Sequence, residues 1–249
     1  GLRYYDFTEE RTQIFDGIFA DPASRPGTID ANGVVPRVIA TVKVSGSTNL
    51  NAQVSQGFRL GGINDQLNTP ICTAEDLATF GGREAWKDEK AWNYEIGSKS
   101  RVMNGRGSFS VAAFNMDITD LQATVTAGSC SSRLIFNVPK ARARGLEAEL
   151  ALAPNESFDF SVSVSLNNSE LRSTLRSGGA VVAGIQEGNR LPSVPEIQAA
   201  ASATYQWRLR NDALVYITGS FQHSGSRFTQ IGDQASGFGS VNLLSFGAS

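Results

Sequence analysis

The sequence predicts an all-β protein, namely an antiparallel up-and-down transmembrane β-barrel to which this chain contributes about ten strands. Apolar and polar residues alternate along most of the chain, as they do in strands whose side chains point to two faces. The connections between these stretches are long and short in turn. That regularity is typical of outer-membrane barrels, where tight turns face the periplasm and long loops face the outside.

The alternation is clearest at residues 142–173, which we interpret as a β-hairpin. One face of its two arms is apolar: Leu146, Ala148, Leu150, Leu152, Phe158, Phe160, Val162, Val164 and Leu166. The other face is small or charged: Glu147, Glu149, Ala151, Asp159, Ser161, Ser163, Ser165 and Asn167. Residues 153–156 between the arms form a turn signal that is too short for a crossover. Since a soluble sandwich could also contain one such hairpin, the fold prediction depends on the repetition of the pattern.

The pattern does repeat along the chain. Predicted strands cover approximately residues 1–8, 34–44, 48–58, 91–103, 106–122, the two hairpin arms, 191–207, 213–228 and 238–246. The longest connections are expected at 9–33, 59–90 and 173–189, whereas Asn104-Gly105 is a strong hairpin turn. Several strands exceed the ~9–11 residues that cross a bilayer at a tilt. Aromatic residues near strand ends could form interfacial girdles: Trp92, Tyr94, Phe158, Phe160, Tyr205 and Trp207.

Composition excludes several classes of protein. Charged residues make up 18% of the 249 residues, below the roughly 25% of average soluble domains. The net charge of -2 argues against a nucleic-acid partner. No apolar run reaches the ~18 residues of a transmembrane helix, which excludes a helical membrane protein. The chain has neither an initiator Met nor a signal peptide, so we expect it to be an excerpt of a longer protein.

Several segments carry a family resemblance. Residues 92–101 (WNYEIGSKSR) resemble the barrel signature of TonB-dependent outer-membrane receptors. Residues 107–114, 117–122, 137–149 and 188–196 follow as they do in that family, so that the resemblance covers about residues 34–246. Each segment alone is a weak signal, whereas their order and spacing together are fairly specific.

The resemblance implies a place in a larger structure. The family has a 22-stranded barrel filled by a plug domain, and it imports ferric siderophores, cobalamin or glycans with energy from the TonB complex. It implies that residues 1–249 are a segment of the C-terminal half of such a barrel, in the bacterial outer membrane, without the plug and the final strands. We therefore expect no stable ion conductance from the isolated chain, because an open sheet leaves unpaired edges in lipid.

The sequence offers little catalytic chemistry, and we expect neither an enzyme nor a cofactor. His223 is the single histidine and has no ligand cluster around it, so a metal site is not expected. Glu147 and Glu149 share one face and are interpreted as lumen charges that face Arg or Lys of neighbouring strands. Asp117 and Asp120 lie near a predicted outer loop, but their spacing matches no calcium loop.

Three hypotheses concern binding and linkage. Recognition of a small-molecule or metal-chelate ligand is expected in the long loops, through charged or aromatic residues there: Arg59, Arg83, Trp86, Lys87 and Arg133. Cys72 and Cys130 both fall in predicted outer loops, where they form either a disulfide or two free thiols. Arg142 and Arg144 could contact lipopolysaccharide phosphates, since Arg binds phosphate in a fork.

Two other functions stay open beside nutrient import. A soluble β-rich binding or adhesion domain could mimic the alternation of a barrel, and its solubility without detergent would reveal it. A passive outer-membrane porin is also compatible with the strand pattern, although the signature segments weaken that interpretation.

Overall fold

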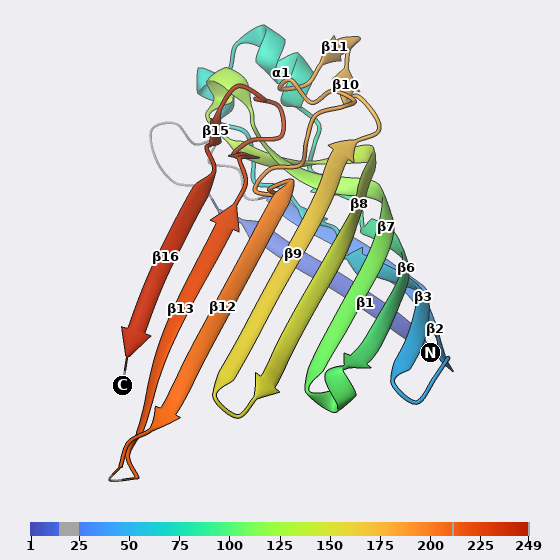
Figure 1. The fold of residues 1–249 in the computed structure, drawn as a ribbon. Coiled ribbons are helices and arrows are strands. Elements are labelled where there is room, and N and C mark those ends of the chain that lie inside the picture. Colours follow the sequence, from blue (N-terminus) through green and yellow to red (C-terminus); the bar gives the residue numbers. More distant parts are fainter. Residues whose placement is uncertain (15–24, 211, 249) are drawn as a thin grey trace.

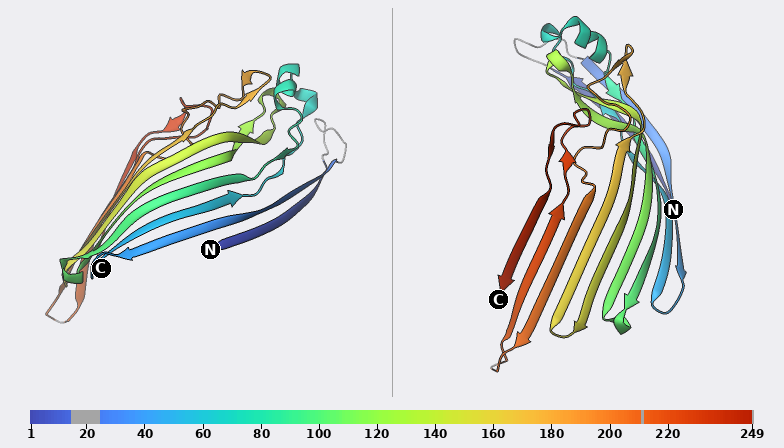
Figure 2. Two further views of the ribbon diagram at one scale, coloured as in Figure 1. Left: turned by 90° about the vertical axis from the view of Figure 1, so that its right-hand side faces the viewer. Right: turned by 45° about the horizontal axis from the view of Figure 1, so that its top comes forward.

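The computed structural model describes residues 1–14, 25–210 and 212–248, and these residues form one large antiparallel sheet (Figure 1). Its ten strands are β1 (Leu2–Gln13), β2 (Arg25–Lys43), β3 (Thr48–Arg59), β6 (Glu89–Val102), β7 (Gly107–Thr126), β8 (Arg133–Asn155), β9 (Phe158–Leu171), β12 (Ile197–Arg208), β13 (Leu214–Ser224) and β16 (Val241–Ala248). They are neighbours in chain order, as in an up-and-down meander. The predicted fold class is therefore confirmed, and the sheet is curved but not closed (Figure 2).

The two ends of the sheet differ. The long connections gather at one end, drawn at the top of Figure 1 and called here the loop end, and the tight turns gather at the other, called the turn end. The loops carry short elements: β4 (Gly62–Ile63), η1 (Thr69–Ile71), α1 (Ala74–Phe80), β5 (Ala85–Trp86), η3 (Gly128–Cys130), β10 (Arg176–Ser177), β11 (Ala180–Val181), β14 (Arg227–Phe228) and β15 (Gly237–Phe238). At the turn end, η2 (Met103–Gly105) places Asn104 at a φ of 55°, as a tight hairpin turn requires.

The first connection is much shorter than predicted. Residues 9–13 and 25–33 were expected to be loop, but they belong to β1 and β2, which pair from Gln13↔Arg25 to Leu2↔Pro36. The prediction failed because Gly27 and Gly33 read as turn residues. Gly33 instead leaves room for the ring of Tyr5 on the opposite strand, where an added Cβ would lie 2.8 Å from it. Residues 15–24 of the expected connection lie outside the described residues.

The register gives the sheet an apolar face and a polar face. One cross-strand row on the first face is entirely apolar: Ile96, Ala113, Leu146, Leu166 and Ile197. On the other face, one row reads Lys43, Asn49, Lys99, Ser110, Glu149 and Ser163. The large apolar side chains are exposed, with Ile96 at 63% and Leu146 at 43%. Such a surface requires lipid, and it faces away from the polar concave side.

Aromatic residues lie at both ends of the apolar band. Near the loop end, the rings of Trp92 and Tyr94 stack with centroids 6.5 Å apart. Near the turn end, Tyr205 and Trp207 stack at 5.8 Å. This arrangement fits the two interfacial girdles of a membrane barrel.

The buried core lies under the loops rather than within the membrane-spanning part. Its fully or almost fully buried members come from β7, β8, β9 and four connections: Phe80, Ile118, Ala123, Val125, Ala127, Cys130, Leu134, Phe136, Val138, Ala141, Leu171, Leu175, Val182, Ile185 and Ile231. The tip of the β7–β8 hairpin takes part after Asp120, whose φ is 53°. Among the residues that the structure describes, no helix has the length and hydropathy to cross a membrane.

Candidate ligand-binding surface

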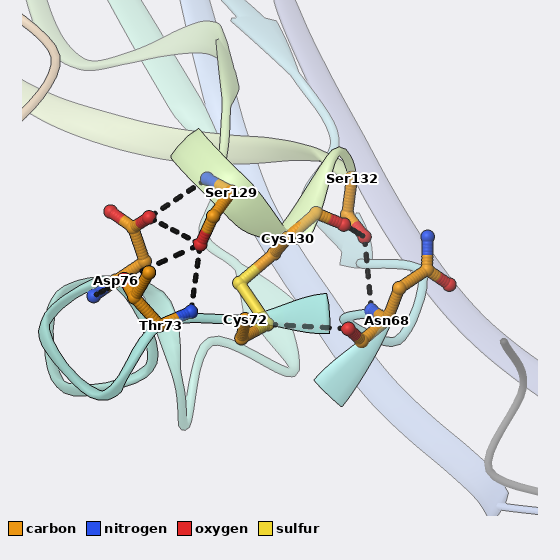
Figure 3. Close-up of a disulfide and its surroundings, with 7 residues drawn as sticks. All are labelled: Asn68, Cys72, Thr73, Asp76, Ser129, Cys130 and Ser132. Carbon is orange, nitrogen blue, oxygen red and sulfur yellow. Dashed lines mark hydrogen bonds between the residues drawn. A yellow bond between two sulfur atoms is a disulfide. The ribbon is translucent and has the colours of Figure 1, made fainter. Parts of the chain in front are cut away.

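A disulfide joins the two loops that carry α1 and η3 (Figure 3). The sulfur atoms of Cys72 and Cys130 lie 2.09 Å apart, and 58 residues separate the two cysteines in the chain. Cys130 is fully buried in the core described above. The bridge therefore fastens the β3–β6 connection to the β7–β8 connection at the loop end.

A hydrogen-bonded clamp lies beside the disulfide. The Ser129 amide and hydroxyl both donate to Asp76 Oδ2, at 2.8 and 2.6 Å. The Thr73 amide donates to Ser129 Oγ at 2.8 Å, and the Thr73 hydroxyl accepts from the Asp76 amide as the N-cap of α1. The hydrogen bonds from the Ser129 hydroxyl and amide lower the pKa of Asp76. This clamp and the disulfide hold α1 against η3.

Three amide side chains connect the β3–β6 connection to the strands. Asn64 is 5% exposed, accepts from the Ile135 amide at 2.7 Å and donates to the Ile135 and Arg83 carbonyls at 3.0 Å each. Asn137 pairs with the backbone of Lys87 in the same way, at 2.7 and 2.9 Å. Gln122 donates to the Leu60 carbonyl at 2.8 Å.

Sequence reasoning missed these three residues. Ile135 is 71 residues from Asn64, and Lys87 is 50 residues from Asn137. A polar residue in a loop is locally indistinguishable from a turn residue or a solvated side chain. An alternative signal does exist for Asn137, because it lies within the segment 137–149 that resembles the family.

A hollow of about 480 Å³ lies between this connection and the tips of β1, β2 and β8. Its walls combine apolar side chains with amides and charges: Gln13, Pro26, Gly27, Ile63, Asn64, Asp65, Gln66, Leu67, Thr69, Leu77, Phe80, Gly81, Gly82, Arg83, Glu84 and Leu134. The Arg83 guanidinium carbon lies 5.0 Å from the centre of the Phe136 ring, in cation–π geometry. Within the described part of the chain, Arg83 is the only one of the five predicted ligand-binding residues that lines this hollow.

The other four predicted loop residues lie elsewhere at the loop end. Arg59 pairs with Glu89 at 3.7 Å. Trp86 packs over Gly62 on the paired strand, and Lys87 is held through its backbone by Asn137. Arg133 is exposed at the start of β8. The structure therefore does not bring the five residues together into one site.

A second hollow, of about 690 Å³, follows the polar concave face. Glu95, Glu147 and Glu149 contribute carboxylates to it, and Lys99 contributes a cation. The expectation that Glu147 and Glu149 face Arg or Lys on adjacent strands is wrong, because their register partners are Ala112, Ser110, Ser163 and Ser165. Small side chains opposite the carboxylates leave space on this face, and the nearest cation in the row, Lys99, is two strands from Glu149.

The convex face holds the two arginines that were considered for lipopolysaccharide. Arg142 Nε donates to Asp117 Oδ1 at 2.7 Å, so this guanidinium already has an anionic partner. Arg144 is exposed one register pair closer to the apolar band. Asp117 is occupied by Arg142, and among the described residues neither Asp117 nor Asp120 belongs to a group that could hold a cation.

Metal-binding residues do not gather anywhere in the described part of the chain. His223 lies on the convex face, where its Nδ1 is 2.7 Å from Asn242 Oδ1.

An apolar convex face, a polar concave face and a structured loop end together define a segment of the wall of a membrane β-barrel. The chain matches the family model of the TonB-dependent receptor-like β-barrel over residues 1–248, and it belongs to that family.

Solved structures with the same fold include two uptake or siderophore receptors and a copper transporter. The ferric yersiniabactin uptake receptor FyuA of Yersinia pestis is 19% identical with a TM-score of 0.72, and 98% of this chain is matched. The siderophore receptor PiuA of Acinetobacter baumannii is 16% identical with a TM-score of 0.74 over 99% of this chain. The copper transporter OprC is 14% identical with a TM-score of 0.67 over 98%. The chain spans about a third of each of these structures, namely 33%, 33% and 36%.

Proposed function

We propose that this chain forms part of a bacterial outer-membrane receptor that takes up a scarce nutrient with energy from TonB. It contributes a segment of the barrel wall and a cap, by which we mean the connections at the loop end and the core buried beneath them. The single observation that carries the proposal is the hollow of about 480 Å³ at the loop end, held open by the disulfide and the amide contacts. Family membership supports this function over a soluble adhesion domain or a passive porin. Coupling to TonB would run through the plug domain of the family.

The substrate class that fits best is an anionic metal chelate such as a ferric siderophore. Arg83 lines the hollow, and its cation lies over an aromatic ring that fixes its position. An ionised donor strengthens a hydrogen bond to an anionic ligand. The cargo of the structural relatives includes ferric yersiniabactin and copper, so the fold alone does not choose between a chelate, cobalamin, a glycan and a metal.

Uptake by living cells tests the proposal. Iron-starved cells that carry this protein as their only siderophore receptor would be given ⁵⁵Fe-labelled hydroxamate, catecholate and phenolate siderophores, with radioactive copper and cobalamin in parallel. We expect saturable uptake of one chelate that disappears in cells without TonB. Equal uptake with and without TonB would contradict the proposal and favour a porin.

A substitution then locates the ligand. Arg83→Ala is expected to weaken uptake at low substrate roughly tenfold, the effect of one charge-assisted hydrogen bond. Arg210→Ala, an exposed arginine in the turn after β12, is the matched control and should leave uptake unchanged.

A further inference from the structure

Three cations cross the convex face near the loop end. Lys90 and Lys140 are both register partners of Thr119, on β6 and β8, and Arg144 lies four residues further along β8 on the same face. All three are exposed. Within the part of the chain that the structure describes, their side-chain nitrogens have no acidic or hydrogen-bonding partner. We call these three residues the outward basic patch.

Two neighbouring arginines on this face already have acidic partners. Arg142 pairs with Asp117 at 2.7 Å, and Arg172 pairs with Glu170 at 3.0 Å. The two acidic groups are therefore occupied, and the outward basic patch keeps three positive charges for an outside partner. The sequence analysis proposed Arg142 and Arg144 as contacts for lipopolysaccharide. Of these two, only Arg144 belongs to the patch, and Lys90 and Lys140 were not predicted.

The patch lies just beyond the apolar band. On the convex face, the next row of side chains from Arg144 toward the turn end is the apolar row that contains Leu146. Tyr94 lies in the same cross-strand row as Arg144, with Asn115 between them, and its ring stacks on that of Trp92. Aromatic residues of this kind mark the level of lipid headgroups. The patch is therefore at headgroup height on the lipid side of the barrel wall.

The spacing of the three cations favours a headgroup with more than one phosphate. Neighbouring strands lie ~4.8 Å apart, so the backbones of Lys90 and Lys140, two strands apart, are separated by ~10 Å. Arg144 is a further ~13 Å along β8 at 3.3 Å per residue. A single phosphate does not reach all three positions, whereas a rigid headgroup with two separated phosphates reaches at least two of them.

We propose that the outward basic patch binds the phosphates of lipopolysaccharide in the outer leaflet. This inference rests on the proposed outer-membrane location, which puts the loop end of the convex face in that leaflet. Basic clusters at the headgroup level attract anionic lipid at about 1 kcal/mol per Lys or Arg. The partner is thus a permanent lipid neighbour of the barrel wall, bound on the face opposite to the nutrient.

Binding of purified lipid A to the protein purified from outer membranes tests the inference. Titration would use nanodiscs that contain bisphosphorylated lipid A, monophosphorylated lipid A or lipid A stripped of both phosphates. The triple substitution Lys90→Ala, Lys140→Ala and Arg144→Ala should weaken binding of the bisphosphorylated form roughly 100-fold. The stripped form should bind the wild type and the variant equally weakly.

A matched control separates the patch from a general change in charge. The concave-face triple substitution Lys43→Ala, Lys99→Ala and Arg101→Ala removes the same number of cations from β2 and β6, and it should leave lipid binding unchanged. A charge-preserving variant, Lys90→Arg with Lys140→Arg, should retain binding, which excludes misfolding as the cause of the loss.

Two results would overturn the inference. One is a patch variant that binds bisphosphorylated lipid A within about threefold of the wild type; the other is equal binding of the stripped and bisphosphorylated forms. The assay needs no transport, so a failure of nutrient uptake with intact lipid binding would remove only the proposed cargo. Recovery of the protein in solution without detergent would instead remove the outer-membrane function itself.

Discussion

The spanning part of the sheet and the cap at the loop end are stabilised in opposite ways. In the spanning part the large apolar side chains point outward and are exposed, as at Ile96 and Leu146, and the strands are held by their hydrogen-bond ladders. In the cap the apolar side chains are buried under loops, as at Leu134 and Phe136, with a disulfide and specific amide contacts between connections. Lipid completes the first region, whereas the second has a core of its own.

The strand β8 passes through both regions and allows the sharpest comparison. Leu134→Ala in the cap should cost about 2–5 kcal/mol, because it leaves a cavity in packed surroundings. Leu146→Ala in the spanning part should cost only about 1–2 kcal/mol, because lipid tails fill the vacated space and only the water-to-lipid transfer of the deleted carbons is lost. Guanidinium unfolding in lipid vesicles, with hydrogen exchange of cap amides, measures both. Equal costs would contradict the division into two regions.

Removal of the disulfide should affect the cap alone. Cys72→Ser with Cys130→Ser should destabilise the cap by about 2–4 kcal/mol, since the bridge closes a long loop, and should leave the sheet intact. Limited proteolysis within residues 60–88 reports the change. Intact mass is the direct check: a difference of two protons between oxidised and reduced protein is expected, and its absence would contradict the bridge.

Substitution of a glycine tests how closely side chains and backbone pack around it in the sheet. A Cβ added at Gly145 would clash with the Leu166 carbonyl oxygen of one paired strand and lie 2.7 Å from the Phe114 ring of the other. We therefore expect Gly145→Ala to cost about 1–3 kcal/mol through overpacking. Gly57→Ala is the control within the same sheet, because its nearest neighbour would be 4.0 Å away. Heat-induced unfolding in detergent compares the two, and similar midpoints would refute the role of the glycine.

The smallest expected effect is a pH dependence of the cap. Hydrogen bonds from Ser129 lower the pKa of Asp76 below its usual 3.8, so the contribution of the clamp is complete above that value. It should be lost as the pH falls through the lowered pKa of the folded state. Hydrogen exchange or protease sensitivity around α1 from pH 6 to pH 2 would show the step. Asp76→Asn should abolish it, and a step of equal size in that variant would assign the effect to another group.

Predictability from sequence follows the same division. The alternation around Leu146 and Glu147 is local, so the sequence was sufficient to predict β8, β9 and most of the sheet. The extension of β2 through Gly33 was not predicted, because the space for the Tyr5 ring depends on the paired strand. The cap depends on contacts such as Asn64 to Ile135, 71 residues apart, which no local pattern encodes.

The most direct test of the barrel assignment is a spin-label scan from residue 146 to residue 150 in lipid vesicles. Labels at 146, 148 and 150 should be accessible to oxygen dissolved in the bilayer, and labels at 147 and 149 to a water-soluble nickel chelate, which gives a period of two. That result would place the apolar face in lipid and the polar face on water. Equal access of the nickel chelate to all five positions would contradict the account.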